Sequence, residues 1–428
     1  MTPMRSDTTF TKDGLMIVYG AKGAALYDVA RAKVYALNKS AASIIESLCS
    51  GKSIEQIVDR ISIEEHTDHD AIRSAISEFI DQLIELNLSL SSLASTSSNA
   101  NDQAQPKEMR EIWCELTSRC NLKCLHCYAS AGQRKASEDK PATAWINIIH
   151  EIAQLNCRHI QLTGGELFLR RDVWQIIDAS IAAIPEVEIF SNLTVSNIAE
   201  IVRRKDYLSV ATTLLGPTSD IHDAITQSKG SFLKTTSAIK DLVKAGVRIR
   251  VAVIEMNQNH QHISDTLSLI KSMGVSRYGT DYMRSVGRGV INRKVAPLGP
   301  VQSRPRRMTS SSFLYNRNYN PCWAHKIAIE PDGTVIPCIF SRTIAVGNAF
   351  HESLISILSS DRLQDLWRIT LDQVDVCKDC EFRYSCHDCR PLALYENGGM
   401  YAKAPRCSYD PYSGFWSNTN DNSVANGV

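Results

Sequence analysis

Three cysteines lie within eight residues of one another in the run Cys120-Asn-Leu-Lys-Cys124-Leu-His-Cys127, directly after an apolar stretch. Thiolates are the ligands that hold iron–sulfur clusters. A four-iron cluster held by three thiolates keeps one iron open for another ligand. A structural zinc site, the alternative, would need a fourth Cys or His nearby, and His126 is poorly placed between two of the cysteines. The triplet therefore indicates a four-iron cluster with one open iron.

A second run, Leu162-Thr-Gly-Gly-Glu-Leu167, follows at the end of the next expected strand. Paired glycines let a backbone approach a ligand closely. Together, the triplet and this run resemble the radical S-adenosylmethionine (radical SAM) enzymes. The resemblance implies that the open iron chelates SAM and that the reduced cluster splits SAM into methionine and a 5′-deoxyadenosyl radical. It also implies that Gly164, Gly165 and Glu166 meet the methionine amino group, with Leu167 where the family usually has Pro.

The resemblance extends to the ends of later strands. Ser191 and Asn192 occupy the place where the family presents a polar side chain to SAM, and Thr213 lies in the matching stretch after the fourth strand. Two departures weaken the site for the SAM carboxylate. Leu215 replaces an Asp, and Thr226 replaces the Arg that would pair with the carboxylate. Two further expectations concern Lys229, which could substitute for that Arg, and the run from Val251 to Ile254, which would wall the adenine.

Strand and helix patterns alternate from about Glu111 to Arg284. Strands are expected at 112–117, 159–163, 187–190, 208–212, 248–253 and 277–282, with helices such as 142–156, 173–183, 232–245 and 263–273. Six such units predict an α/β fold, a parallel sheet closed into a partial (β/α)6 barrel of TIM type. Chemistry in such barrels gathers on loops at the carboxyl ends of the strands. The cysteine triplet follows the first expected strand directly, as this fold requires.

Seven of the thirteen cysteines lie near the C-terminus: Cys322, Cys338, Cys377, Cys380, Cys386, Cys389 and Cys407. Their spacing resembles the SPASM extension, which carries auxiliary iron–sulfur clusters. The resemblance implies one cluster fully ligated by Cys377, Cys380, Cys386 and Cys407. Cys322, Cys338 and Cys389 would hold a second cluster whose fourth position is open or filled by another group. Two residues separate Cys386 from Cys389, where the family usually has three. Structural zinc is the alternative here too.

The N-terminal segment of about ninety residues precedes a polar linker at 92–108. Strands are expected at 15–19, 24–27 and 33–37, and helices at 38–49, from Ser53 with its Ser-x-x-Gln capping box, and at 69–85. This pattern predicts a small winged-helix unit. The run Val34 to Ile45 with Asp81 to Leu86 resembles the PqqD-like domains of enzymes that modify ribosomally made peptides. The resemblance implies that a leader peptide adds as an extra strand; a DNA-binding winged helix is the rival, but the helices lack a basic face.

Composition narrows the range of partners. The chain has 428 residues, 43% of them hydrophobic and 22% charged, with a formal net charge of +1. That balance argues against nucleic acid as a partner, and the length predicts two to three domains. There is no apolar run of the roughly 18 residues that a membrane span needs and no signal-peptide core, so we expect a cytoplasmic protein without a membrane partner. The cysteines are then metal ligands, except Cys49, Cys114 and Cys157, which we expect to be buried small hydrophobes.

The sequence thus predicts a radical SAM enzyme that modifies a precursor peptide by hydrogen abstraction, forming a thioether or carbon–carbon crosslink. The expected cofactors are SAM, one SAM-binding 4Fe-4S cluster and two auxiliary clusters of the same type, with a flavodoxin- or ferredoxin-type reductant as a further partner. The expected domains are 10–91 for peptide recognition, 92–108 for the linker, 109–305 for the barrel, 306–412 for the SPASM extension and 413–428 for a tail. Two alternatives remain: an activator of a protein or quinone-cofactor precursor, as in sulfatase maturation, and a non-catalytic leader-binding or electron-transfer protein.

Overall fold

The computed structural model describes residues 8–10, 15–86, 88, 109–133, 135, 138–291, 308–386, 389–405 and 407–416. The expected linker at 92–108 lies outside the described residues, as does most of the expected tail. The chain divides into two compact units, each considered by itself below. Unit 1 comprises Met1–Gln105, Pro300–Cys322 and Arg368–Val428, and unit 2 comprises Pro106–Gly299 and Trp323–Trp367. This division assigns residues 323–367 to the barrel's unit, whereas the sequence grouped them with the C-terminal cysteines.

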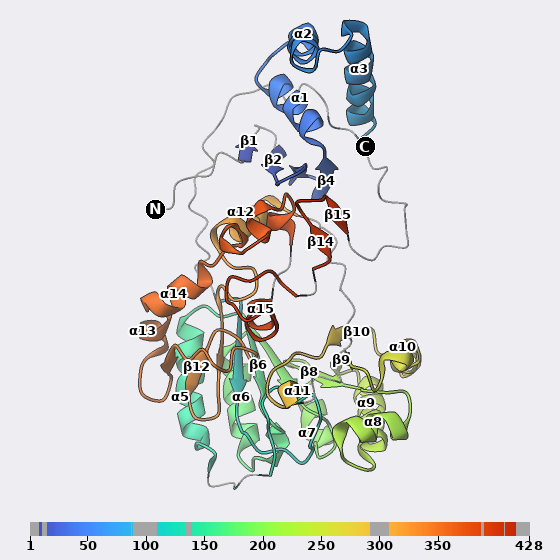
Figure 1. Ribbon diagram of the computed structural model, residues 1–428. Helices are drawn as coiled ribbons and strands as arrows, with labels where there is room; N and C mark the ends of the chain where they lie inside the picture. Colours follow the sequence, from blue (N-terminus) through green and yellow to red (C-terminus); the bar gives the residue numbers. More distant parts are fainter. Residues whose placement is uncertain are drawn as a thin grey trace. The chain divides into compact units, whose positions relative to one another are not determined.

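Unit 2 is built on a sheet whose first six strands are all parallel to their neighbours. The strands are β5 (Glu111–Glu115), β6 (His159–Thr163), β7 (Glu186–Phe190), β8 (Leu208–Thr213), β9 (Arg248–Glu255) and β10 (Arg277–Tyr282). They lie in chain order, so β5 and β10 are the first and last of these six strands. Each strand connects to the next through helices, which is the arrangement expected of a partial barrel (Figure 1). The predicted α/β barrel class is confirmed, and the strand ends differ from prediction by two residues or fewer.

The barrel helices are α5 (Ala142–Gln154), α6 (Val173–Ala183), α7 (Ile198–Arg203), α8 (Ser219–Thr226), α9 (Ser231–Lys244), α10 (Ile263–Ser272) and α11 (Arg288–Ile291). Their apolar sides are buried; on α5, for example, Trp145, Ile149 and Ile152 have no exposed surface. The short helices α7, α8 and α11 were not anticipated, because helices of eight residues or fewer have too few turns to show a periodic pattern. Ile112 and Cys114 of β5 are fully buried, in agreement with the expectation for Cys114.

The sheet continues beyond β5 with strands from the C-terminal third of the chain. β11 (Lys326–Ile329) runs parallel to β5, and Lys326 pairs with Glu111. The antiparallel strands β12 (Thr334–Ile336) and β13 (Gly347–Asn348) follow, then helices α13 (Leu354–Leu358) and α14 (Asp361–Trp367). The loop after β12 carries Cys338. Part of the C-terminal segment is therefore built into the barrel sheet.

Unit 1 contains a four-stranded antiparallel sheet with strand order β1 (Thr8–Phe10), β2 (Leu15–Tyr19), β3 (Ala24–Asp28) and β4 (Lys33–Leu37). Helices α1 (Lys39–Cys49), α2 (Ile54–Glu65) and α3 (His69–Glu85) follow. Asn38 caps α1, and the Ser53–Gln56 capping box at α2 has both of its hydrogen bonds. The three strands and three helices expected here are confirmed, and β1 is an addition.

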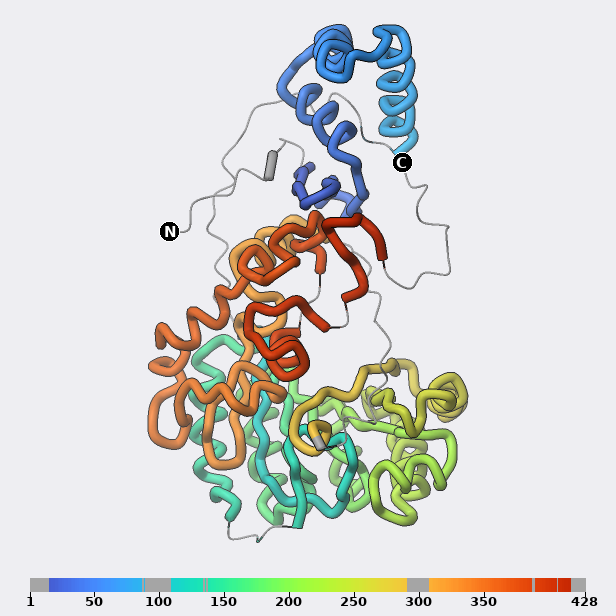
Figure 2. Tube along the Cα trace, in the orientation of Figure 1, coloured from blue at the N-terminus to red at the C-terminus, as the bar shows by residue number. Residues whose placement is uncertain are grey.

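The two faces of this sheet have different coverings. Leu15, Ile17 and Leu26 form one core with residues of α1 and α3. Met16, Val18, Ala25 and Tyr27, which alternate with them, form another core with Met308, Phe313 and Tyr384. Phe313 belongs to α12 (Ser310–Asn318), and Met308 lies just before this helix. Tyr384 belongs to the segment of the C-terminal cysteines, which continues into α15 (Arg390–Glu396), β14 (Tyr409–Asp410) and β15 (Phe415–Trp416). Figure 2 shows the orange and red segments of this unit beside the blue strands.

None of the helices in the described ranges is both long enough and apolar enough to cross a lipid bilayer.

Candidate active site

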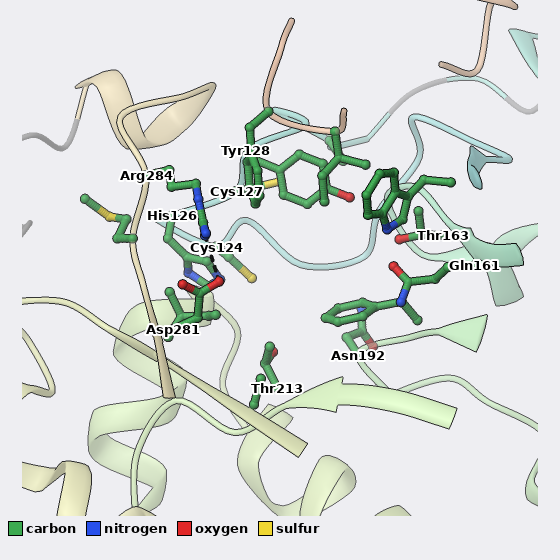
Figure 3. Close-up of a pocket in the computed structure, with 18 of the residues that line it drawn as sticks. Cys124, His126, Cys127, Tyr128, Gln161, Thr163, Asn192, Thr213, Asp281 and Arg284 are labelled. Carbon is green, nitrogen blue, oxygen red and sulfur yellow. Dashed lines mark hydrogen bonds and ion pairs between the residues drawn. The ribbon is translucent and has the colours of Figure 1, made fainter. Parts of the chain in front are cut away.

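A cavity of about 710 Å³ lies in unit 2 and is lined by residues at the carboxyl ends of the strands. The predicted site residues that line it are Cys120, Cys124, Cys127, Gly164, Gly165, Asn192 and Thr213. Figure 3 shows Cys124, His126 and Cys127 grouped on one side, with Thr213 and Asn192 coming from the ends of other strands. The fold therefore brings the cysteine triplet and most of the predicted SAM contacts to one cavity.

Each of the three cysteines is half-buried. Burial raises the pKa of Cys120 to about 11, and it raises the pKa of Cys124 further, with the neighbouring Cys127 and Cys120 adding to the effect. None of the three cysteines is in a disulfide, and thiols gathered in one cavity are suited to bind metal, which replaces their protons. No described group of His, Cys, Asp and Glu converges closely enough for a single metal ion, whereas thiolates of one cubane bind different irons and stand further apart. The donor set thus fits an iron–sulfur cluster with three cysteine ligands.

The paired glycines let the turn after β6 lie directly on the loop that carries the cysteines. The Gly165 N–H donates to Thr117 O (2.7 Å), and the Glu166 N–H donates to Arg119 O (2.8 Å). A Cβ on Gly165 would lie 2.0 Å from Arg119 O, and one on Gly164, where φ is +130°, would lie 2.5 Å from Thr117 O. Neither contact is possible for a real side chain, so both positions need glycine.

Glu166 does not line the cavity. Its fully buried carboxylate accepts hydrogen bonds from the Ser191 hydroxyl (2.9 Å), the Asn192 N–H (2.8 Å) and the Phe168 N–H (3.1 Å). Burial raises the pKa of Glu166 to about 7, although these donors oppose the shift. Ser191 is likewise buried behind the cavity wall. Glu166 and Ser191 therefore join the ends of β6 and β7, while Asn192, whose Nδ2 lies 3.9 Å from Cys120 Sγ, faces the cavity.

The residue at the position of the family's carboxylate-pairing Arg, Thr226, carries no charge. Thr226 is buried, and its hydroxyl lies 2.7 Å from that of Ser231. Leu215 packs with Ile225, Met256 and Met283 in a small core. Lys229 is not among the residues that line the cavity, whereas Val251, Ala252 and Ile254 are. The SAM contacts named from the sequence stay predictions.

Several residues of the cavity were given no role from the sequence. Four arginines line it: Arg250, Arg277, Arg284 and Arg288. Arg250 donates to Glu188 (2.7 Å), which also accepts from Gln161 (2.5 Å), and Arg284 forms an ion pair with Asp281 (2.7 Å; Figure 3). Alternating polar residues on parallel strands are the signal that indicates an inward-facing polar layer.

His126 also faces this cavity. The residue is half-buried, but its Nδ1 is shielded from water and has no hydrogen-bond partner among the described residues, and burial lowers its pKa to about 4. Burial without a partner is costly for a polar atom. An unpaired, neutral imidazole nitrogen beside the cysteines is suited to accept or donate one hydrogen bond when a ligand fills the cavity.

The residue after Cys127 links the cysteine loop to the C-terminal part of the sheet. The Tyr128 ring meets Phe340 edge-on, with centroids 5.4 Å apart, and the Arg342 guanidinium lies over it at 5.1 Å. Arg342 in turn forms ion pairs with Glu115 of β5 and with Glu330. Phe340 lines the cavity and lies two residues beyond Cys338. This segment therefore forms a wall of the site.

Six of the seven C-terminal cysteines belong to unit 1, and Cys338 belongs to unit 2. Burial raises the pKa of Cys380, and the nearby Glu381, Cys377 and Cys407 add to that rise, which places these three thiols close together. The C-terminal ligand sets, including Cys322, Cys386 and Cys389, stay predictions, as does their division between two clusters.

Three family profiles match separate parts of the chain. The Radical SAM superfamily matches residues 114–270, the SPASM iron–sulfur cluster-binding domain matches residues 322–381, and coenzyme PQQ synthesis protein D (PqqD) matches residues 23–88. The first match spans β5 to most of α10, including the cysteine loop and the glycine turn. The second includes Cys322, Cys338, Cys377 and Cys380. The third covers β3 to the end of α3.

Whole-chain comparisons agree. The antilisterial bacteriocin subtilosin biosynthesis protein AlbA of Bacillus subtilis is 27% identical over 408 residues, which cover 87% of this chain and 88% of that protein. The mycofactocin maturase MftC of Mycolicibacterium smegmatis is 26% identical over 315 residues, covering 68% and 77%. The fold matches Streptococcus suis SuiB, solved with S-adenosylmethionine, at a TM-score of 0.54 and 14% identity over 93% of this chain and 98% of that one. The chain is a radical SAM enzyme with a SPASM cluster-binding domain and an N-terminal PqqD-like domain.

Proposed function

We propose that this enzyme modifies a ribosomally synthesised precursor peptide and closes a thioether or carbon–carbon crosslink in it. The observation that carries the proposal is the cavity itself. Cys120, Cys124 and Cys127 open onto the same space as the glycine turn and Asn192. AlbA and MftC, whose names describe biosynthesis of a bacteriocin and maturation of mycofactocin, are the relatives that favour this substrate class.

The chemistry that the bound cluster and SAM supply is one-electron cleavage of SAM to methionine and a 5′-deoxyadenosyl radical, which takes a hydrogen atom from the peptide. The protein's own residues define where this happens. The backbone of Gly164 and Gly165 forms one wall, Asn192 and Thr213 present polar groups, and the 710 Å³ space has room for more than one small molecule. Tyr128 and Phe340 line part of the cavity with aromatic surface, which would help to exclude water from a reactive species.

Crosslinking also needs an exit for one electron. Removal of one hydrogen atom, followed by loss of a proton and an electron as the new bond closes, takes two hydrogen atoms from the peptide. We propose that an auxiliary cluster held by the C-terminal cysteines accepts that electron, and that a flavodoxin- or ferredoxin-type protein supplies the electron for SAM cleavage. Such low-potential chemistry suits the cytoplasm.

For peptide recognition we propose strand addition at β4. The sheet order places β4 at one edge, with β3 on one side and no described strand on the other. Open backbone N–H and C=O groups on an edge strand are what an extended peptide binds. Tyr35 of β4 packs, only partly buried, against the core that contains Leu15, Ile17 and Leu26, so the edge strand carries an apolar side chain that is still partly accessible.

The decisive experiment uses the full chain reconstituted with iron and sulfide without oxygen. With SAM and dithionite we expect 5′-deoxyadenosine, and with the peptide encoded by the neighbouring short reading frame we expect a product lighter by two hydrogen atoms per crosslink. Loss of alkylation of a peptide cysteine would identify a thioether, and retained alkylation a carbon–carbon bond. Absence of 5′-deoxyadenosine would leave only a binding or electron-transfer role.

Peptide binding is tested separately by hydrogen exchange. We expect the same peptide to slow exchange of alternate amides in β4, whose outward N–H groups would become hydrogen-bonded. Amides of α2, a helix that is not part of the sheet, are the internal control. Protection elsewhere with unchanged exchange in β4 would contradict strand addition.

A further inference from the structure

Arg288 follows β10, the last of the six barrel strands, in the chain. It nevertheless contacts the loop that follows β5, the first of these strands. Its Nε donates a hydrogen bond to Cys124 O (2.7 Å), and its Nη1 donates to Ala131 O (2.6 Å). Its backbone N–H donates to Cys127 O (3.0 Å). We call residues 120–131 the SAM-cluster loop. One side chain and one amide thus connect the two ends of the barrel at the cysteines.

The residue before Arg288 makes this approach possible. Gly287 has a φ of +58°, and a Cβ there would lie 2.3 Å from Tyr128 O and 2.6 Å from Cys127 O. No side chain fits that space, so the backbone of the Gly287-Arg288 pair lies directly against the loop. Its position is set by main-chain packing as well as by hydrogen bonds, and the charge of Arg288 is therefore fixed in space.

That charge lies beside the cysteines, because the nitrogen that donates to Cys124 O is part of the guanidinium itself. Arg288 also lines the cavity.

We propose that Arg288 is a positioning residue that fixes the SAM-cluster loop and raises the reduction potential of the cluster bound there. The inference rests on the proposed function, since it takes Cys120, Cys124 and Cys127 as cluster ligands. One-electron reduction by an external donor adds one negative charge to a cluster with three thiolates. A fixed cation in a site of low dielectric stabilises that charge more than the oxidised state, and potentials of such clusters follow net charge, hydrogen bonding and burial.

Two substitutions separate the roles of charge and geometry. Arg288→Gln removes the charge, and Arg288→Lys keeps it but cannot reproduce the two-carbonyl contact of a planar guanidinium. The control is Arg248→Gln, which removes an equal charge from an exposed residue at the amino end of β9. Each full-length variant is reconstituted with iron and sulfide without oxygen, and its iron content and redox titration are followed by electron paramagnetic resonance. The signal that changes on adding SAM belongs to the cluster held by Cys120, Cys124 and Cys127.

For Arg288→Gln we expect the midpoint potential of the SAM-responsive signal to move to more negative values. Arg288→Lys should keep the potential near that of the unmodified chain but lower the iron content, and Arg248→Gln should change neither. Selective loss of the SAM-responsive signal in Arg288→Gln, with the remaining signals intact, would also support the positioning role. Unchanged potential and unchanged iron in both Arg288 variants would overturn the proposal. A missing SAM response in the unmodified chain would instead contradict the proposed function.

Discussion

The two cysteine loops of this enzyme are held by different kinds of partner. The SAM-cluster loop in unit 2 is held by the Arg288 guanidinium and by backbone contacts with the glycine turn. The auxiliary-cluster loop, residues 377–383 in unit 1, is held by the N-terminal sheet. There the Ala21 N–H donates to Asp379 O (2.7 Å), and the Tyr27 hydroxyl donates to Glu381 O (2.8 Å).

A buried arginine completes the second arrangement. Arg383 donates from one nitrogen to Tyr19 O and to Cys380 O, both at 2.9 Å, and so joins the end of β2 to a cysteine of the loop. The difference between the loops predicts which parts of the enzyme a substitution near each loop affects. Damage around the SAM-cluster loop should stay with cofactor chemistry, whereas damage around the auxiliary-cluster loop should also reach the peptide-recognition sheet, since the two share one core.

The largest contrast is expected from removing one thiol in each loop. Cys124→Ala should lower 5′-deoxyadenosine formation by more than about 100-fold, because loss of a ligand should exceed the loss from an outer-shell partner. Cys380→Ala should leave SAM cleavage without peptide largely intact while it abolishes crosslinking. Both are measured by chromatography of 5′-deoxyadenosine and mass spectrometry of the peptide. Equal loss of SAM cleavage in the two variants would show that the loops do not act separately.

Glu166, beside the SAM-cluster loop, is expected to make the stability of the chain depend on pH. Its buried carboxylate accepts hydrogen bonds from three residues. Its pKa is raised from 4.5 to about 7 by burial. Because the folded chain holds this proton more tightly than the unfolded chain, the stabilising contribution is complete below pH 4.5 and is lost as the pH rises to 7. On the order of 3 kcal/mol of unfolding free energy is involved.

The test compares urea unfolding of the apoprotein and of Glu166→Gln between pH 4.5 and 7.5. The difference between the two free energies of unfolding should change across this interval and level off above pH 7. Glu65→Gln, which alters an exposed carboxylate at the end of α2, is measured alongside as the control. A flat difference for Glu166→Gln would mean that the carboxyl is ionised in the folded chain throughout.

Gly20 tests the contact between the N-terminal sheet and the auxiliary-cluster loop. A Cβ at this position would lie 2.4 Å from Glu381 Oε2 and 2.9 Å from Glu381 N. Gly20→Ala should therefore destabilise unit 1 by roughly 1–3 kcal/mol, the usual cost of overpacking, and should lower auxiliary iron without changing the SAM-responsive signal.

The control is Gly399→Ala, also in unit 1, where a new Cβ would meet Ala402 at an ordinary 3.6 Å. Thermal unfolding and iron content of both variants provide the comparison. Retained auxiliary iron in Gly20→Ala would show that the loop does not depend on the recognition sheet.

These contrasts also show what the sequence could and could not predict. Local patterns predicted the barrel strands, the caps at Asn38 and Ser53, and the cysteines that line the cavity. Each of these depends on neighbours a few residues apart. The pairing of β11 with β5 and the reach of Arg288 back to Cys124 join segments far apart in the chain, and no local periodicity reports such contacts. The Gly287-Arg288-Gly289 run at the end of the sixth strand was the available signal, because flanking glycines at a strand end indicate close backbone approach.

The smallest expected effect comes from single hydroxyl groups on neighbouring strands of the recognition sheet. The fully buried Tyr27 of β3 donates to Glu381 O, so Tyr27→Phe leaves a buried carbonyl with one partner fewer and should cost about 1–2 kcal/mol. The Tyr35 hydroxyl of β4 is buried with no hydrogen-bond partner among the described residues, so Tyr35→Phe should be neutral or slightly stabilising. Urea unfolding of both variants measures the difference. Because Tyr27 belongs to the sheet and Glu381 to the auxiliary-cluster loop, the Tyr27→Phe loss should shrink when the loop is already disturbed by Gly20→Ala; strict additivity of the two would mean that sheet and loop are energetically independent.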